Sequence, residues 1–503
     1  MFLHARFTER VNPLKPSQPL YRLRLKFDHG GDLSFIDKLR SVGNCRLGQL
    51  CKGVKLSSQD LGELVEKRNA IDKELDQIRP RLPLDLHPSM FQEHGHIMAG
   101  IGHGKSLLIQ KLVAGWLPHV EAGDLSIVVI DSQRDLIRDL VGIKAVTNGP
   151  LGARTMLLDG SAMPAPSISP FSRPARWASY GGAHAERIAT ASSDALIYAI
   201  SALFGDGAMT AIQATLLSWA LRALAERPTP TLRELMDLLE VEALSKEAKE
   251  TGAVTARKDI KDPETRSYFE ALPFNSRAAN TASELKTRLY GVMARPAIAR
   301  LFDISGAKID LFDAMAAGSF VLVDTAKDAL GSVGASLYGR LIIAMLSNAI
   351  NERLALPKDQ RKPTVIIIDE CADYLAGNDR LLIELLTQAR KANVAIILAH
   401  QHLGQLSPEV AAAVLGNVSC KIYGALSHAD RGRIGPEINW THDELSLLRK
   451  AETMTLFALW SKAHGQRAIK CGVPLVGIGS ILPQSSRDDI SAWRTTNRER
   501  VAA

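Results

Sequence analysis

The chain has 503 residues, with 61 lysines and arginines against 54 aspartates and glutamates, so its formal net charge is +7. Hydrophobic residues make up 46% and charged residues 23% of the sequence, which is typical of a globular protein and argues against a disordered chain. At about 150 residues per domain, this length allows roughly three domains. The mild basic excess is compatible with a polyanionic partner and, taken alone, is weak evidence for one.

No run approaches the about 18 consecutive apolar residues that a membrane span needs. The first ten residues also lack the apolar core of a secretory signal. We therefore expect a cytoplasmic protein without an integral membrane segment. The cysteines form no CxxC pair and are odd in number, which argues against a disulfide framework and a zinc ribbon: Cys45, Cys51, Cys371, Cys420 and Cys471.

Residues 1–93 carry no strong motif, and we assign them to an N-terminal region of unclear fold. Apolar residues at helical spacing predict a charged helix from Ser58 to Ile78, which ends before Pro80 and Pro83. From residue 94 to residue 185 the pattern becomes strand, glycine-rich loop, helix and strand, followed by a Pro- and Ser-rich crossover loop. This part is predicted to be the first half of an α/β domain.

Residues 186–303 are helical in character and are predicted to form an all-α insertion domain. Strands and helices alternate again over 304–475, and 476–503 reads as a loose tail. Buried apolar strands that alternate with helices imply a parallel sheet. The predicted helices of the insertion are Ile188–Leu203, Ala208–Glu226, Thr231–Leu239 and Ala279–Met293. After the strand at Ile97–Ala99, the predicted strands are Leu125–Ile130, Thr155–Asp159, Phe320–Asp324, Val365–Ile368, Val394–Ala399, Cys420–Ala425 and Met454–Leu459.

The segment AGIGHGKS fits the phosphate-binding loop, with alanine where the first glycine is usual. Its glycines can turn successive N–H groups toward an anion, and the following helix presents its positive end to phosphates. Lys105 is predicted to reach the β- and γ-phosphates of ATP, and the Ser106 hydroxyl to bind Mg²⁺. The alternative, a glycine turn that binds nothing, does not explain Lys-Ser in register. The predicted nucleotide-binding set is Ala99, Gly100, Ile101, Gly102, His103, Gly104, Lys105, Ser106 and Leu107.

The strand at Val365–Ile368 ends in two carboxylates, Asp369 and Glu370. At the carboxyl edge of a parallel sheet such groups face the ligand crevice. Asp369 is predicted to hold Mg²⁺ through a water, and Glu370 to orient the attacking water as a base. The alternative is a surface acid pair that caps the next helix.

A further strand ends at Gln401, which is a candidate sensor of the γ-phosphate. The alternative is an ordinary loop glutamine. His400 and His402 flank it and could be combined with His428 into a metal site, but nothing in the sequence imposes that geometry.

Arg390 closes the predicted helix before that strand. It is either a cation that the helix dipole favours, or a residue that reaches the nucleotide of a neighbouring subunit. Arg431 and Arg433 are rival candidates for the second role. Arg134 and Arg138 follow a strand end and could face DNA, although solvated surface charge is the interpretation that we favour.

With these residues collected, the chain resembles the DNA-pumping ATPases of the HerA/FtsK superfamily, above all the conjugative coupling proteins of the TraG/TraD type. The resemblance covers roughly residues 94–434. It rests on HGHIMAGIGHGKSLL, on IVVIDSQRDL and on the block from Ile309 to Arg431, and it is most specific in QARKANVAIILAHQ.

The resemblance implies a RecA-like P-loop NTPase fold, a hexameric ring with ATP and Mg²⁺ between subunits, and DNA in the pore. It also implies that Arg390 is the arginine finger, that Gln401 is the sensor glutamine, and that the insertion is similar to the all-α domain of coupling proteins. Three features depart from the pattern. The usual N-terminal membrane helices and the β-barrel of HerA are not evident, and His103 stands where Ser or Thr is common.

We therefore expect an ATP hydrolase that translocates DNA. It would act either in DNA transfer, with a relaxosome or secretion component as partner, or in repair or antiphage defence with a nuclease. The alternative is a nucleotide-gated oligomeric scaffold that recruits an effector protein and never pumps DNA.

Overall fold

The computed structural model of the chain describes residues 84–502, apart from 172, 202–208, 228–229, 242–256, 303–307, 376–378, 464 and 466. The helix predicted at Ser58–Ile78 lies outside the described residues, as do Cys45 and Cys51. Residues from Leu86 onward form one compact unit, and the description below concerns that unit.

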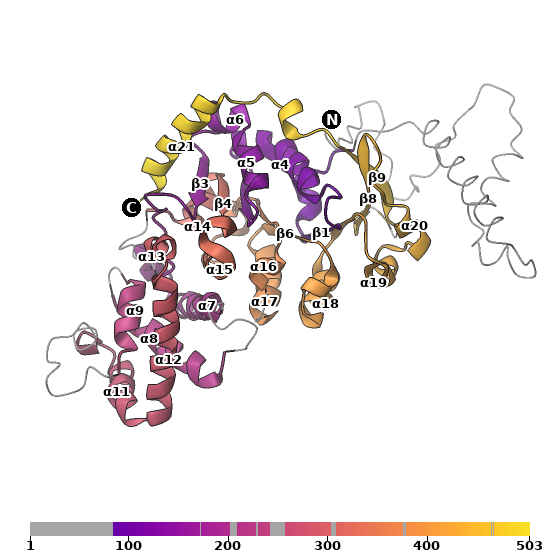
Figure 1. The fold of residues 1–503 in the computed structure, drawn as a ribbon. Helices are drawn as coiled ribbons and strands as arrows, with labels where there is room; N and C mark the ends of the chain where they lie inside the picture. Colours follow the sequence, from indigo (N-terminus) through magenta and orange to yellow (C-terminus); the bar gives the residue numbers. More distant parts are fainter. Residues whose placement is uncertain are drawn as a thin grey trace, which may run out of the picture. The chain divides into compact units, whose positions relative to one another are not determined.

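A sheet of nine strands forms the centre of the described residues (Figure 1). The seven strands from β3 to β7 in spatial order are parallel, as the sequence predicted for the α/β fold. Every residue of β1, β2, β4, β5, β6 and β7 is buried, because parallel strands are covered by helices on both faces. The spatial order is β3 (Thr155–Asp159), β4 (Phe320–Asp324), β2 (Ser126–Asp131), β5 (Thr364–Ile368), β6 (Val394–His400), β1 (Gly95–Met98), β7 (Cys420–Tyr423), β8 (Met454–Ser461) and β9 (Ile469–Pro474).

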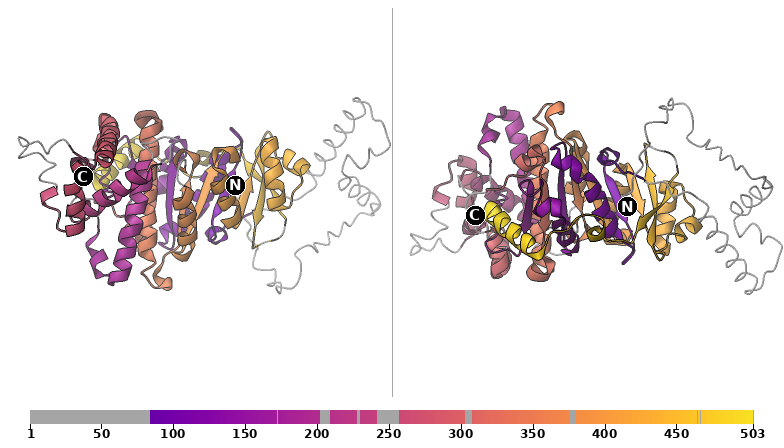
Figure 2. Two further views of the ribbon diagram at one scale, coloured as in Figure 1. Left: turned by 90° about the horizontal axis from the view of Figure 1, so that it is seen from below. Right: turned by 90° about the horizontal axis from the view of Figure 1, so that it is seen from above.

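Two helical layers cover the sheet, as Figure 1 and the two turned views of Figure 2 show. One layer contains α4 (Lys105–Glu121), α5 (Asp135–Val141) and α6 (Lys144–Thr147). The other contains α14 (Leu311–Ala317), α15 (Lys327–Arg353), α16 (Ala372–Leu375), α17 (Asp379–Lys391) and α18 (Pro408–Asn417). The crossover helices therefore alternate with the parallel strands, as in other doubly wound sheets.

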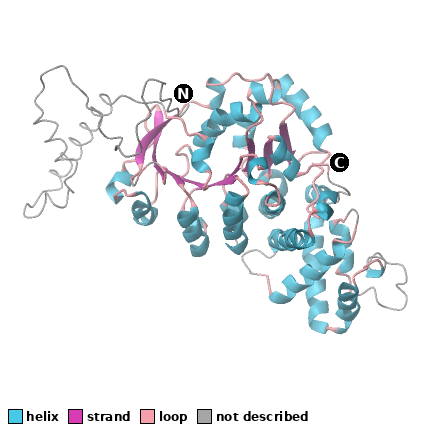
Figure 3. Cartoon of the chain, turned by 180° about the vertical axis from the view of Figure 1, so that it is seen from behind, coloured by secondary structure: helices cyan, strands magenta, loops and turns pink. Residues whose placement is uncertain are grey.

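Among the described residues between β3 and β4, the elements of regular structure are helices, as expected for an all-α insertion (Figure 3). Two of its helices begin with a capping box, in which Thr210 or Thr231 accepts an N–H bond from the glutamine or glutamate three residues later. The first helix packs along α15 and so joins the insertion to the sheet layers. The helices are α7 (Gly182–Ser201), α8 (Ala211–Leu224), α9 (Leu232–Leu238), α11 (Pro263–Ala271), α12 (Ser276–Met293) and α13 (Pro296–Phe302).

Helix α15 is, by length and composition, the one helix in the described part of the chain that is apolar enough to cross a membrane. Its most apolar window is 67% buried inside the fold, against α7, α14, α16 and α17. Such burial is the property of a core helix, and we interpret α15 as one.

The last segment differs from the loose tail that the sequence predicted. Residues Arg487–Val501 form helix α21, which begins with a Ser486–Asp489 capping box. Asn497 accepts the Leu157 N–H at 3.1 Å and donates to the Leu157 carbonyl at 3.0 Å, as a neighbouring strand would do. The helix therefore covers the free edge of β3, which would otherwise expose unpaired backbone groups.

The other end of the sheet carries an antiparallel extension that the sequence predicted only in part. Strand β8 matches the expectation, whereas β9 was not predicted. β8 pairs antiparallel with both β7 and β9. Helices α19 (His428–Ile438) and α20 (His442–Ser446) connect β7 with β8.

Candidate nucleotide-binding site

The phosphate loop connects β1 with α4, as the sequence predicted. Gly102 and Gly104 have positive φ values of +71° and +96°, which glycine adopts without strain. Gly104 is the N-cap of α4, and its carbonyl accepts the first helical bond from the Leu108 N–H at 2.9 Å. The N–H groups of the first turn of α4 therefore have no preceding turn to bond, which is the geometry that binds phosphates.

Lys105 lies at the start of α4 with its side chain only 7% exposed, beside two carboxylates that follow β5. Its ammonium contacts Asp369 and lies 3.0 Å from Glu370 Oε1. Burial by itself would lower the pKa of Lys105, but the two carboxylates outweigh it and raise that pKa. The lysine is therefore held charged at the carboxyl edge of the sheet.

Ser106 and Asp369 bring two hard oxygen donors together, with 3.4 Å between the Ser106 hydroxyl and Asp369 Oδ2. Asp369 follows β5 directly and is 2% exposed. A hydroxyl beside a carboxylate fits the octahedral oxygen coordination of Mg²⁺, which retains several waters. These residues therefore suit a magnesium ion bound with the phosphates.

Glu370 and Gln401 contact each other at the same edge of the sheet, although they follow different strands, β5 and β6. The Gln401 amide donates to Glu370 Oε1 at 3.1 Å. Glu370 has a φ of +47°, a region that residues with a Cβ rarely adopt and that often marks functional positions. β5 and β6 are parallel neighbours, so their ends carry both side chains to one place.

Aspartates end the strands on the side of β5 away from β6. Asp131 of β2 pairs in register with Asp324 of β4, which pairs in turn with Asp159 of β3. Asp131 is 1% exposed, and burial together with the nearby Asp369 charge raises its pKa to about 7. The edge beside the phosphate loop is therefore acidic.

Arg134 neutralises part of this acidic edge and is not the solvated surface charge that the sequence favoured. Its guanidinium lies 2.8 Å from Asp324 and 3.4 Å from Asp159, and it also bonds both oxygens of Asp328 at 3.0 Å. Arg134 thus cross-links the ends of β2, β3 and β4. Arg138 is 67% exposed and pairs with Asp135.

The side chain of His103, in the phosphate loop, points toward β8. Its imidazole donates to the Leu456 carbonyl at 2.9 Å, and its ring packs edge-on against Phe457. Thr455 donates to the His103 carbonyl at 2.6 Å. Strand β8 thereby supports the phosphate loop from outside, a contact that no local sequence signal indicated.

Arg390 lies at the far end of β6 from Gln401. Its guanidinium is 61% exposed and forms an ion pair with Glu93 at 2.5 Å. Because β6 spans seven residues, Arg390 lies more than about 20 Å from the Gln401 of its own chain. The rivals Arg431 and Arg433 lie on α19, where Arg431 donates to the Leu426 carbonyl at 3.1 Å.

The candidate metal histidines do not form a cluster. His400 bonds His96, and the His428 ring lies beside that of His442. Across the described residues, no group of three or more histidines, cysteines and carboxylates could hold a metal ion. The described cysteines, Cys371, Cys420 and Cys471, are buried free thiols.

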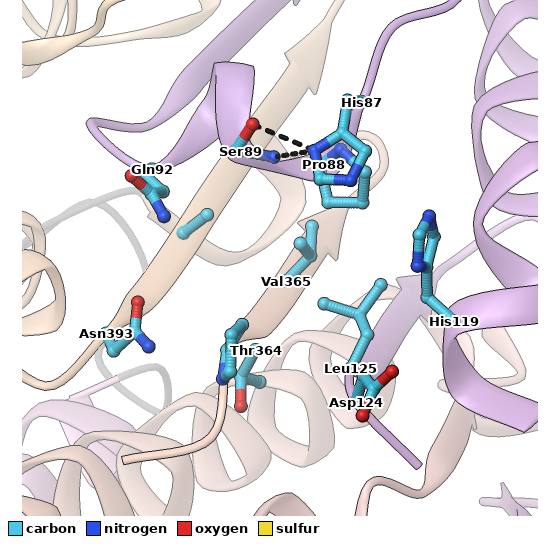
Figure 4. Close-up of a pocket in the computed structure, with 12 residues that line it drawn as sticks. His87, Pro88, Ser89, Gln92, His119, Asp124, Leu125, Thr364, Val365 and Asn393 are labelled. Carbon is cyan, nitrogen blue, oxygen red and sulfur yellow. Dashed lines mark hydrogen bonds between the residues drawn. The ribbon is translucent and has the colours of Figure 1, made fainter. Parts of the chain in front are cut away.

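A cavity of about 200 Å³ opens at the other edge of the sheet, where β5 and β6 begin (Figure 4). The residues that line it include His87, His119, Asp124, Thr364 and Asn393. The full length of β5 separates this cavity from Asp369, so it is not part of the candidate site.

No protein-family model matches this chain, and no curated protein sequence matches it. Solved structures of the plasmid coupling protein TrwB do match its fold. TrwB in complex with the ATP analogue ADPNP is 16% identical, with a TM-score of 0.53 over 78% of this chain and 88% of TrwB. TrwB in complex with ADP and Mg²⁺ is 16% identical, with a TM-score of 0.51 over 81% and 90%.

The unbound form of the bacterial conjugative coupling protein TrwBdeltaN70 is also similar, with 14% identity and a TM-score of 0.52 over 77% of this chain and 86% of that protein. The chain therefore has the RecA-like P-loop ATPase fold of the bacterial conjugative coupling protein TrwB.

Proposed function

We propose that this chain is an ATP-driven DNA translocase, in which subunits of a homo-oligomeric ring hydrolyse ATP and move DNA. The observation that carries the proposal is the convergence of Lys105, Ser106, Asp369, Glu370 and Gln401 at one edge of the sheet. These are the residue types that bind phosphates and Mg²⁺ and orient a water for phosphoryl transfer.

Lys105 and the N–H groups of the phosphate loop would bind the β- and γ-phosphates. The lysine would exchange its contacts with Asp369 and Glu370 for phosphate oxygens, which frees both carboxylates for other partners. Glu370 would then accept a hydrogen bond from the attacking water, and Gln401 holds the Glu370 carboxylate in place.

Ser106 and Asp369 would hold Mg²⁺, Asp369 through a water molecule. The ion neutralises charge on the β- and γ-phosphates and orients them for in-line attack. TrwB was solved with ADP and Mg²⁺, which supports a nucleotide and Mg²⁺ as the ligands of this chain.

Arg390 supports a ring, because it cannot reach the phosphate loop of its own chain. An exposed guanidinium at the opposite edge of the sheet suits contact with the nucleotide of a neighbouring subunit, where it would stabilise transition-state charge. We propose a cytoplasmic hexamer, with DNA in its pore and a protein partner. The partner would be a relaxosome or secretion component in DNA transfer, or a nuclease in repair or antiphage defence.

The test is the steady-state rate of ATP hydrolysis by the purified full-length chain with Mg²⁺, measured with and without DNA. We expect a rate that rises at least about tenfold with DNA and falls to background in Lys105→Ala, because the lysine binds the reacting phosphates. Glu409→Gln is a matched control, since Glu409 is an exposed acidic residue on α18.

The opposite results have distinct meanings. A rate that does not depend on Lys105 would contradict the ATPase. A rate that depends on Lys105 and ignores DNA of either strandedness would contradict the translocase and favour the nucleotide-gated scaffold.

A further inference from the structure

A row of buried polar side chains crosses three neighbouring strands beside the phosphate loop. His96 on β1 lies between Tyr423 at the end of β7 and His400 at the end of β6. The Tyr423 hydroxyl lies 2.9 Å from His96 Nδ1, and His96 Nε2 lies 2.7 Å from His400 Nε2. His400 Nδ1 lies 3.0 Å from the His402 carbonyl. All three side chains are completely buried.

The hydrogen bonds of this row can run in one direction only. Burial lowers the pKa of His400 to about 4 and that of His96 well below its usual value, so both imidazoles are neutral near pH 7. A carbonyl oxygen accepts, so His400 Nδ1 carries the proton and His400 Nε2 accepts. His96 Nε2 must therefore donate to His400, and His96 Nδ1 must accept from the Tyr423 hydroxyl.

The last hydrogen bond of the row, from His400 Nδ1 to the His402 carbonyl, fixes the backbone of Gln401 between them. Because His400 and His402 flank Gln401, the bond between them closes a ring around the Gln401 backbone. The Gln405 side chain also accepts the N–H groups of Gln401 at 2.8 Å and His402 at 3.1 Å. The Gln401 amide, held in this way, donates to Glu370 at 3.1 Å.

We propose that Tyr423, His96 and His400 are positioning residues that hold the Gln401 amide against the Glu370 carboxylate. The proposal rests on the proposed function, because the position of Glu370 matters only if Glu370 orients the attacking water. Loss of the Tyr423 hydroxyl leaves His96 Nδ1 without its donor. Each imidazole can then change its tautomer, and the bond that encloses Gln401 is no longer imposed.

The experiment measures kcat and KM for ATP in the Tyr423→Phe variant of the full chain. We expect kcat to fall about 5- to 20-fold while KM changes less than about twofold, because the phosphate loop keeps its contacts. Tyr338→Phe is the matched control. Tyr338 on α15 is equally buried, but its hydroxyl has no hydrogen-bond partner among the described residues. The kcat of the Tyr338→Phe variant should therefore equal that of the wild type.

A double-mutant cycle separates positioning from general damage to the fold. If Tyr423 acts through Gln401, Tyr423→Phe should lower kcat by less than about twofold in a Gln401→Ala background. A conservative pair gives a second readout. His400→Asn keeps an N–H donor where Nδ1 stood, so it should retain several times the kcat of His400→Leu.

Lys105→Ala, measured in the same assay, distinguishes the two proposals. A rate of ATP hydrolysis that does not depend on Lys105 would contradict both the proposed function and the positioning role of Tyr423, His96 and His400. A rate that depends on Lys105 but is unchanged in Tyr423→Phe, or reduced equally in both backgrounds, overturns the positioning alone. If Tyr423→Phe does not fold, the comparison of His400→Asn with His400→Leu decides, and equal kcat values reject the proposal.

Discussion

At the scale of single residues, Glu370 combines three unusual features. Its backbone lies in the left-handed region, its side chain is 13% exposed, and it contacts both Lys105 and Gln401. The positive φ turns the chain sharply after β5. The side chains of the adjacent residues Asp369 and Glu370 can therefore contact different partners. The Asp369 carboxylate lies beside the Ser106 hydroxyl, which we propose as a magnesium ligand, and the Glu370 carboxylate contacts Gln401.

We expect Glu370→Gln to lower kcat for ATP hydrolysis by about 100-fold or more, while ATP still binds. Glutamine keeps the size of the side chain but cannot accept the proton of the attacking water. Nucleotide affinity measured with a fluorescent ATP analogue should change less than about threefold, because Lys105 and the phosphate loop are intact. A kcat within about twofold of the wild type would show that Glu370 is not the base.

His400 makes the stability of the protein depend on pH. Burial lowers its pKa to about 4, whereas in the unfolded chain it returns to near 6.5. Between these values the unfolded state binds one more proton, so the free energy of unfolding falls as the pH drops from 6.5 to 4. This residue contributes up to about 1.4 kcal/mol per pH unit, and its contribution is fully present above pH 6.5.

The measurement is urea unfolding of the wild type and of His400→Asn at pH 7.5, 6.0 and 5.0. The variant should lose less stability on acidification, because it lacks the buried imidazole. Parallel losses in the two proteins would contradict the assignment of this dependence to His400.

At the scale of elements, the phosphate loop depends on strands that are distant in sequence. β8 bonds the His103 backbone and side chain. Gly424, the residue after β7, donates its N–H to the carbonyl of Met98 at the end of β1 at 2.8 Å. A Cβ atom at Gly424 would lie 2.3 Å from His103 Cδ2 and 2.7 Å from the Ala99 Cβ. The loop therefore has its shape only when the antiparallel end of the sheet is in place.

We expect Gly424→Ala to weaken ATP binding about 5- to 100-fold, because an overpacked contact costs about 1–3 kcal/mol and the loop must shift to relieve it. The affinity can be measured by titration with a fluorescent nucleotide. Gly416→Ala is the control, since a Cβ atom at Gly416 on α18 meets nothing within 4 Å. Equal affinities for the two variants would show that β7 does not shape the loop.

At the scale of the whole molecule, the residues that we propose for the site lie at two opposite edges of the sheet. Lys105, Asp369, Glu370 and Gln401 lie at the carboxyl edge, and Arg390, the proposed arginine finger, lies at the end of α17, before β6 begins. A single subunit therefore cannot place all of them around one nucleotide. A ring, in which one edge meets the opposite edge of the next subunit, would do so.

Mixing two inactive variants tests this arrangement. Lys105→Ala subunits keep Arg390, and Arg390→Ala subunits keep the phosphate loop. In rings formed at random from equal amounts, about one quarter of the subunit contacts join an intact loop to an intact arginine. We expect each variant alone to hydrolyse ATP near background and the mixture to reach up to about a quarter of the wild-type rate.

Arg433→Ala is the control in this experiment. Arg433 is exposed on α19, and the variant should keep its activity without mixing. The opposite outcome is that mixing Lys105→Ala with Arg390→Ala restores no ATP hydrolysis, while Arg433→Ala is inactive alone and regains activity when mixed with Lys105→Ala. In that case the arginine finger is on α19.

Local sequence patterns predicted most of the fold and the candidate site. Apolar runs such as Val394–His400 are buried on both faces, so a buried parallel strand is the structure that they indicate. The segment AGIGHGKS contains the glycines, lysine and serine of a phosphate-binding loop within eight residues. The missed elements lack such patterns. β9 (IKCGVP) begins with the two exposed residues Ile469 and Lys470 and contains a glycine, so it lacks the apolar run of a buried strand. Helix α21 buries only Trp493, Asn497 and Val501 in an otherwise polar sequence, and it bonds β3 through Asn497.

The sequence by itself determined that strands alternate with helices, that a phosphate loop follows β1, and that two carboxylates end β5, because each depends on neighbours along the chain. Only the tertiary structure decided that Arg134 cross-links three strand ends, that His103 turns toward β8, and that Tyr423, His96 and His400 form one row. His96 and Tyr423 are 327 residues apart in sequence. Contacts of that kind follow from the order of strands in the sheet, which no local pattern contains.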